Sequence, residues 1–99
     1  MKLITAQLVK DFKNYPFGSQ DKVKDPLVVA KFFDPCGSAT WYLLEYDHEH
    51  RHAFCYVTGL MEDELGYVSL EELESIKRPF GLTIERDLYF TQEPLSHFK

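Results

Sequence analysis

Residues 65–78, LGYVSLEELESIKR, decide the fold, because they contain the clearest junction between a strand and a helix in this chain. Residues 66–68 predict a short strand. Ser69 follows at the position of a helix N-cap, where its hydroxyl can accept a hydrogen bond from a free backbone N–H of the first turn. Glu72, three residues later, completes a capping box. Pro79 ends the helix, so a strand is expected to run directly into a short helix.

The helix after Ser69 is expected to pack by one face only. Leu70, Leu73 and Ile76 form a narrow apolar stripe at helical spacing. Lys77 and Arg78 are placed near the C-terminal end, where positive charge complements the helix dipole. The chain must therefore supply a second layer for this face to cover.

Three apolar segments upstream of this junction predict strands, and the short turns between them predict antiparallel hairpins. They are residues 27–34 (LVVAKFFD), 40–47 (TWYLLEYD) and 53–58 (AFCYVT). Strict alternation along residues 40–47 divides the side chains between two faces. Trp41, Leu43 and Glu45 lie on one face, and Tyr42, Leu44 and Tyr46 lie on the other.

The two ends of the chain complete the predicted domain. Thr5 is expected to cap a helix over residues 6–14, with Ile4, Leu8 and Phe12 facing the core. Residues 82–90 predict a final strand that bends at residues 85–87. Its expected inward residues are Ile84, Leu88 and Phe90. The prediction is a single α+β domain over residues 1–99, an antiparallel β-meander of about four to five strands with two helices packed on it.

Charge is unevenly distributed along the 99 residues, whose net charge is −5. Residues 1–31 carry six lysines and three aspartates, a net charge of +3, whereas residues 32–99 carry five basic and 13 acidic side chains, a net charge of −8. Such acidity argues against a general nucleic-acid-binding protein, which needs a basic footprint. The acidic charge is compatible with binding to a basic protein surface, and also with a role in solubility alone.

Cytoplasmic localisation is expected. No apolar run approaches the roughly 20 residues of a membrane span, and the first residues lack the apolar region of a signal peptide. The two cysteines, Cys36 and Cys55, do not form a disulfide framework and are interpreted as free thiols. No motif places a base beside Cys36, so a catalytic thiol is not expected.

The most suggestive metal-ligand pattern is residues 47–52, DHEHRH. On an extended strand His48, His50 and His52 would share a face and could bind zinc or nickel. The segment is expected at a hairpin tip, where alternation fails, and Arg51 adds a positive charge between the histidines. We therefore expect no metal site.

No other pattern predicts catalysis. Glu85 and Asp87 are interpreted as surface charges or ion-pair partners, and the lysines of residues 18–26 as part of a solvated loop. The sequence contains no Gly-rich phosphate loop, CxxC, GxSxG or HExxH motif. The aromatic residues of the predicted sheet lack interleaved basic residues and indicate core packing, with any exposed remainder suited to a protein interface. The chain is therefore not expected to be an enzyme or to hold a cofactor.

Three segments carry a resemblance to a known family: ATWYLLEYD (residues 39–47), ELGYVSLEELESI (residues 64–76) and LTIERDLYF (residues 82–90). In order and approximate spacing, over residues 27–95, they resemble a small bacterial family of unknown function carried on plasmids, conjugative elements and phage-related islands. The strings GYVSLxELE and ERDLxF are the more specific part. No catalytic residues are established for that family, so the resemblance implies mobile DNA as the setting and assigns no chemistry.

Some relatives in that family act as anti-CRISPR proteins, so the resemblance implies an inhibitor that binds a type II CRISPR effector nuclease directly. Such nucleases hold nucleic acid through Lys and Arg contacts, for which an acidic surface can compete. The expected partner-binding residues are Glu62, Asp63, Glu64, Glu71, Glu72 and Glu74. The alternative is a non-enzymatic accessory protein of a mobile element that binds another protein of that element. Neither function needs direct contact with nucleic acid or a membrane, and the oligomeric state stays open.

Overall fold

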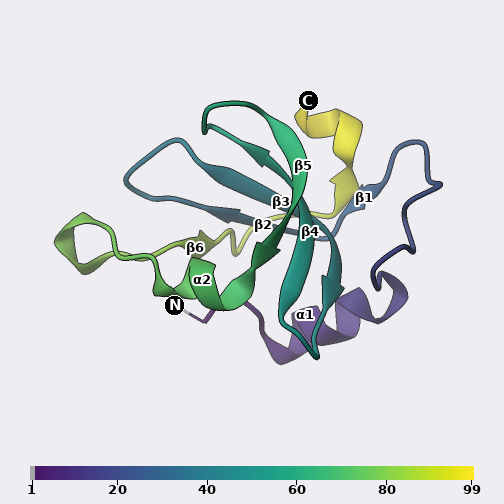
Figure 1. Ribbon diagram of the computed structural model, residues 1–99, viewed down its shortest axis with the longest axis horizontal. Coiled ribbons are helices and arrows are strands. Elements are labelled where there is room, and N and C mark those ends of the chain that lie inside the picture. The colour runs from purple at the N-terminus through teal and green to yellow at the C-terminus, as the bar shows by residue number, and fades with distance from the viewer. Residues whose placement is uncertain (1) are drawn as a thin grey trace.

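A five-stranded antiparallel sheet forms the centre of the computed structural model, which describes residues 2–99 (Figure 1). In spatial order its strands are β5 (Glu64–Ser69), β4 (His52–Thr58), β3 (Thr40–Asp47), β2 (Ala30–Phe33) and β6 (Glu85–Arg86). A second, two-stranded sheet pairs β1 (Leu27–Val28) with β7 (Glu93–Pro94). The helices are α1 (Ala6–Asp11) and α2 (Leu70–Ser75), and the 3₁₀ turns are η1 (Phe12–Asn14), η2 (Pro79–Gly81) and η3 (Leu95–Phe98). The predicted α+β class is confirmed.

Strand β5 runs directly into α2 as predicted, but the helix is shorter, and of the predicted capping box the structure shows the Ser69 half. The Ser69 hydroxyl accepts a hydrogen bond from the Glu72 N–H at 3.3 Å. The helix ends at Ser75 and the backbone is already extended at Ile76, so the prediction that Lys77 and Arg78 would lie at the helix C-terminus is wrong. Residues 77–78 instead pair with residues 82–83, since Lys77 forms an antiparallel bridge with Thr83 and the Arg78 N–H donates to the Leu82 carbonyl at 2.8 Å.

The first helix follows the prediction closely. The Thr5 hydroxyl accepts from the Leu8 N–H at 3.2 Å, and α1 tightens into η1, so that together they cover residues 6–14. Leu8 and Phe12 are buried in the core, as expected.

The predicted strand over residues 27–34 is divided between two sheets. Leu27 and Val28 pair with Pro94 and Glu93, whereas β2 pairs with β3 and β6. Val29 stands between the two strands and donates its N–H to the Leu43 carbonyl at 2.8 Å. The chain thus moves from one sheet to the other at this residue.

A β-bulge in β3 overturns the predicted division of its side chains. Leu43 pairs with Cys55 and Glu45 pairs with Phe54, which leaves one extra residue in β3. A bulge of this kind changes the face on which the following residues lie. Tyr46 is consequently in the same core cluster as Trp41 and Leu43, not with Leu44.

The final predicted strand is largely replaced by turns. Within residues 82–90 the strand paired with β2 is Glu85–Arg86, and the Asp87 N–H adds one further bond, to the Lys31 carbonyl at 3.0 Å. Asp87 then accepts the Tyr89 N–H through its side chain and the Phe90 N–H through its carbonyl, which closes a turn. Ile84 is buried and Phe90 partly buried, as predicted, but Leu88 is exposed, so the prediction of an inward Leu88 is wrong.

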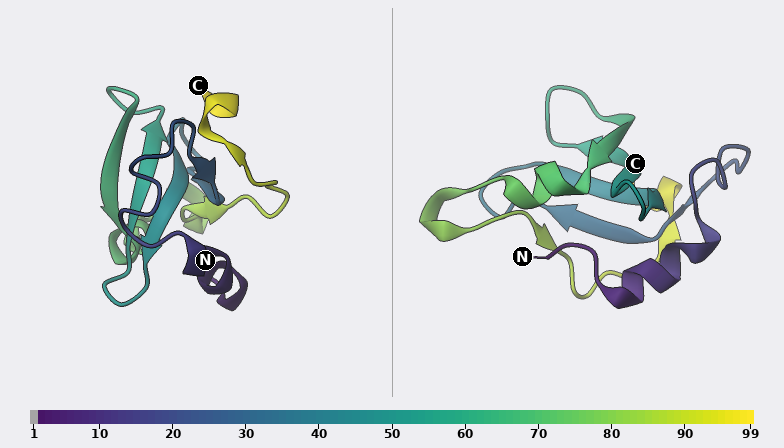
Figure 2. Two further views of the ribbon diagram at one scale, coloured as in Figure 1. Left: turned by 90° about the vertical axis from the view of Figure 1, so that its right-hand side faces the viewer. Right: turned by 60° about the horizontal axis from the view of Figure 1, so that its bottom comes forward.

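The core consists of two clusters. The larger one joins α1 and α2 to the sheet and contains Trp41, Leu43 and Tyr46. The smaller one is built on Val28, Leu44 and Leu95, with aromatic side chains packed around them. Figure 2 shows α1 and the C-terminal turn η3 near different ends of the sheet. Within residues 2–99 no helix is both long and apolar enough to cross a membrane.

Candidate functional site

The six acidic residues predicted to bind a partner fall into two groups at opposite ends of β5 (Figure 1). Glu62 and Asp63 lie in the loop between β4 and β5, and Glu64 begins β5. The other three lie on α2, which follows the far end of that strand. Five steps of about 3.3 Å along the strand separate the groups by roughly 17 Å. A flat partner surface would therefore meet them as two separate contacts.

Glu74 differs from the other acids in the distance along the chain that its carboxylate bridges: Asp63 Oδ1 accepts the Gly59 N–H of its own loop at 3.2 Å, whereas Glu74 joins segments far apart in sequence. Its Oε2 accepts the Leu3 N–H at 2.9 Å, and its Oε1 forms an ion pair with Arg51 Nη2 at 2.8 Å. Burial raises the pKa of the Glu74 carboxyl, but the Leu3 hydrogen bond and the Arg51 ion pair outweigh burial and lower it overall. This carboxylate ties the N-terminal segment, the β3–β4 turn and α2 together.

The β4–β5 loop and the start of β5 combine the first acidic group with exposed apolar side chains. We define the hairpin surface as Leu60, Met61, Glu62, Asp63, Glu64, Leu65 and Tyr67, all of which are exposed. β5 is also an edge strand of the sheet. An open groove of about 570 Å³ runs along this surface, with Trp41 and Val57 among its lining residues. The sequence analysis selected the acids here but not the apolar side chains on either side of them.

The histidines of residues 47–52 do not come together as a ligand set. Among the described residues, 2–99, the group with metal-ligand spacing is Asp47, Glu49 and His50, whose ligand atoms lie within 4.8 Å of one another. His50 Nδ1 bonds Asp47 Oδ2 at 2.7 Å, and this bond raises the pKa of His50. His48 bonds the Tyr46 hydroxyl at 3.0 Å instead. These are the contacts of an exposed polar turn.

The remaining chemical candidates are accounted for by burial or by ordinary structural contacts. Cys55 is buried, and burial raises the pKa of its thiol strongly, which makes it unreactive. Cys36 is exposed, and its sulfur lies 3.9 Å from the Pro79 carbonyl. Asp87 pairs with Lys31 at 3.7 Å, as expected for a surface ion pair.

The polar loop of residues 18–26 is exposed over most of its length, but two buried side chains hold it in place. The Glu45 side chain is only 1% exposed and accepts the backbone N–H groups of Gly18 and Gln20 at 2.9 and 2.8 Å. The Gln20 amide donates to the carbonyls of Leu27 and Leu44 and accepts the Leu27 N–H, at 2.7–2.9 Å. Two buried polar side chains thus fix the loop to β1 and β3, while its lysines, Lys22 and Lys24, are exposed to solvent as expected.

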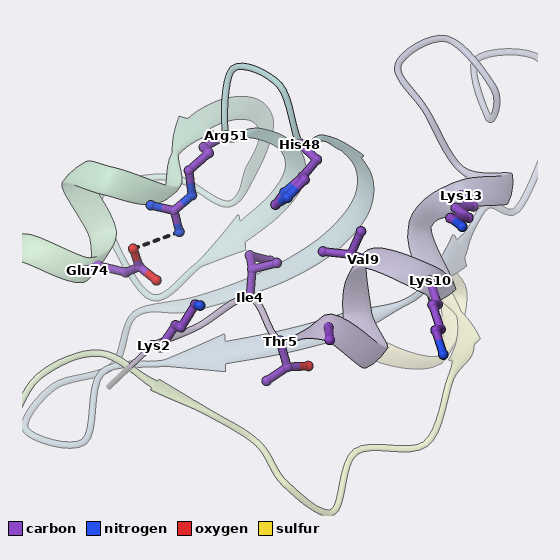
Figure 3. A pocket seen from close by; sticks show the side chains of 10 residues that line it. Lys2, Ile4, Thr5, Val9, Lys10, Lys13, His48, Arg51 and Glu74 are labelled. Atoms are coloured by element: carbon purple, nitrogen blue, oxygen red, sulfur yellow. Dashed lines mark hydrogen bonds and ion pairs between the residues drawn. The ribbon is translucent and has the colours of Figure 1, made fainter.

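A second groove lies between α1, the N-terminal segment and the β3–β4 turn (Figure 3). We call it the basic groove; its volume is about 880 Å³. Its charged and titratable lining residues are Lys2, Lys10, Lys13, His48, Arg51 and Glu74. The apolar side chains of Ile4 and Val9 lie between the lysines (Figure 3).

Sequence reasoning did not identify the basic groove, because its cations come from three separate segments. Lys2 precedes α1, Lys10 and Lys13 lie on one side of α1 and η1, and Arg51 follows β3. The one signal in the sequence was the net charge of +3 over residues 1–31. Counting charges along the sequence showed the excess of positive charge, but it could not show that these cations line one groove.

Comparison with known proteins identifies a family and no characterised relative. The family described as "Protein of unknown function (DUF2958)" matches residues 3–99, nearly the whole chain. No curated protein and no solved structure matches this chain.

Proposed function

We propose that this chain, which belongs to the DUF2958 family, is an anti-CRISPR protein that inhibits a type II CRISPR effector nuclease by direct binding. The proposed setting is the cytoplasm of a bacterium that carries the gene on mobile DNA, as the resemblance of residues 39–47, 64–76 and 82–90 implies. In this proposal the chain has no catalytic residue and needs no cofactor, because binding alone blocks the nuclease.

The observation that carries the proposal is the composition of the hairpin surface. Met61 and Tyr67 are largely exposed on an edge strand and its loop, and acids stand between them. Aromatic residues and methionine are enriched at protein interfaces, and tyrosine is a frequent hot spot. The acids are complementary to the arginines and lysines with which a guided nuclease holds nucleic acid. A surface of this kind suits a basic protein channel better than a nucleic acid.

The role of the second acidic group is narrower than the sequence predicted. Glu71 and Glu72 are exposed on α2 and remain available to a partner. Glu74 is already paired with Arg51 and Leu3, so a partner arginine would have to displace existing bonds. The proposed contact residues are therefore the hairpin surface first and Glu71 and Glu72 second.

The test is DNA cleavage by a purified type II effector with its guide RNA, with this protein added before or after guide loading. We expect dose-dependent loss of cleavage that weakens as salt rises, because screening reduces attraction between exposed charges. The order of addition identifies the step that is blocked. Absence of inhibition across several effector orthologues would reject the proposal and favour an accessory protein of the mobile element, which should then co-purify with another protein of that element.

Three variants locate the contact in the same assay. The first, Glu62→Lys with Glu64→Lys, should weaken inhibition by about tenfold or more, since two attractions become repulsions. The second, Glu71→Lys with Glu72→Lys, makes the same change of charge at the other end of β5. The matched control, Asp21→Lys with Glu49→Lys, changes exposed residues outside both groups. Equal effects of the first variant and the control would show that net charge, not the hairpin surface, is responsible.

A further inference from the structure

The basic groove gathers positive charge in a protein that is acidic overall. Its charged lining contains the cations Lys2, Lys10, Lys13 and Arg51 but one carboxylate, Glu74. Among residues 2–99 that carboxylate is engaged by Arg51 and the Leu3 N–H, whereas neither Lys10 nor Lys13 forms an ion pair. The groove therefore presents a local excess of positive charge to any ligand that enters it.

The arginine at the edge of the groove is held in a fixed position. Arg51 has a left-handed backbone with φ of 54°, a conformation uncommon outside glycine. Its carbonyl accepts the Leu70 N–H at 2.9 Å, and its guanidinium is held by Glu74 at 2.8 Å. Because contacts from α2 lock this residue at both ends, the wall of the groove exists before any ligand arrives.

The floor of the groove is apolar. Ile4 is buried and Val9 partly buried, and both lie between Lys2 on one side and Lys10 and Lys13 on the other (Figure 3). A ligand that fits this arrangement has an apolar or aromatic body with anionic groups attached. A volume of about 880 Å³ is within the range of roughly 300–1,000 Å³ that is typical of small-molecule sites.

Macromolecular ligands fit the groove less well. A nucleic-acid strand needs a longer basic footprint than four cations on a chain of net charge −5. One common mode of peptide binding adds a strand to a free sheet edge, and this mode does not apply to a groove lined by α1, the segment before it and a turn. Lysine ammonium groups, as compact point charges, are well suited to phosphate.

We propose that the basic groove is a binding site for a small organic phosphate of the nucleotide class. Its phosphates contact Lys10 and Lys13, and its base and sugar lie over Ile4 and Val9. This site is separate from the hairpin surface, and the proposal does not depend on inhibition of a nuclease.

The test is titration of the folded chain with ATP, and separately with inorganic pyrophosphate, followed by two-dimensional amide NMR. ATP is expected to shift the resonances of residues 2–13 and 48–51 in a saturable manner. Pyrophosphate, which lacks the base and sugar, is expected to bind the same residues more weakly. The variant Lys10→Glu with Lys13→Glu is expected to weaken ATP binding by about tenfold, because two attractions become repulsions.

A matched control separates the site from general attraction of anions. The variant Lys22→Glu with Lys24→Glu makes the same change of net charge in the loop of residues 18–26, outside the groove, and should leave ATP binding within about twofold. Val9→Ser should weaken ATP binding but leave pyrophosphate binding unchanged, since it alters only the floor. If the milder variant Lys10→Gln with Lys13→Gln binds ATP as the unchanged chain does, the proposal fails.

Three further results would overturn the proposal, the first two of them outright. The first is the absence of saturable shifts with millimolar ATP. The second is equal weakening by the groove variant and the loop control, which would indicate attraction of any anion to any lysine. Shifts with an acidic peptide but not with ATP would likewise replace the proposed ligand class with a protein partner.

Discussion

Replacing Gln20 with alanine is the most direct test of how the loop of residues 18–26 is held. The Gln20 side chain is buried and makes three hydrogen bonds, two to Leu27 and one to the Leu44 carbonyl, at 2.7–2.9 Å. Alanine removes all three and adds no group that can replace them. The Leu27 N–H and the Leu44 carbonyl, which lie next to the core, then lose the Gln20 amide as their hydrogen-bond partner.

The expected cost follows from these bonds. Each intramolecular hydrogen bond contributes about 1 kcal/mol, and each buried group left without a partner costs about 1–3 kcal/mol. We therefore expect Gln20→Ala to lower the free energy of unfolding by about 3 kcal/mol. The total free energy of unfolding of a small domain is about 5–15 kcal/mol, so this loss is a large fraction of its stability.

Urea denaturation followed by circular dichroism measures this change. The control is Gln7→Ala, because Gln7 bonds Asp11 at 3.0 Å on the exposed side of α1 and loses the same atoms. That variant should change the free energy of unfolding by less than about 0.5 kcal/mol. A cost below about 1 kcal/mol for Gln20→Ala, or equal costs for the two variants, would refute the inference that buried hydrogen bonds fix this loop.

Two more predictions concern stability. Gly59→Ala should destabilise the fold by more than about 3 kcal/mol or prevent folding, because a Cβ at this residue (φ of 80°) would lie 1.8 Å from the Ser38 carbonyl oxygen. Gly81→Ala is its control and should cost only about 1–2 kcal/mol, since φ is 74° there but no atom beyond the adjacent residues lies within 4 Å of the added Cβ. Equal losses of stability in urea denaturation would contradict the inferred clash at Gly59. The pKa of Glu74 is lowered from 4.5 in the folded chain, so its charge contributes stability above that pH, and the contribution is lost as pH falls through the folded value. The stability difference between the unchanged chain and Glu74→Gln should therefore shrink as the pH is lowered below about 4.5, and a difference independent of pH would contradict this.

The features that were predicted correctly from the sequence depend on residues close to one another along the chain. The caps at Thr5 and Ser69 need only a hydroxyl three residues before a free N–H, and both form. The bulge in β3 could not be predicted in this way. It places the carboxylate of Glu45 toward backbone N–H groups 25 and 27 residues earlier in the chain, and no local rule specifies that register.

The partial burial of Glu74 could have been predicted from its position on the helix. Glu74 lies four residues after Leu70 on the same helix, so helical spacing places it beside the buried stripe rather than among the solvated acids. Its half-buried position was therefore predictable. Its partners were not, because Leu3 and Arg51 lie 71 and 23 residues away in sequence.

Although the net charge is −5, the fold has two surfaces of opposite sign, the basic groove and the acidic hairpin surface. The turn after β3 lines the basic groove, and the loop after β4 carries Glu62 and Asp63. These two loops are joined by the seven residues of β4, which span roughly 20 Å at about 3.3 Å a step. At physiological salt, exposed charges are screened over about 8 Å, so each surface attracts ligands by its local charge. An acidic total therefore does not exclude a compact anion site, because the position of each charge in the fold decides what each surface attracts.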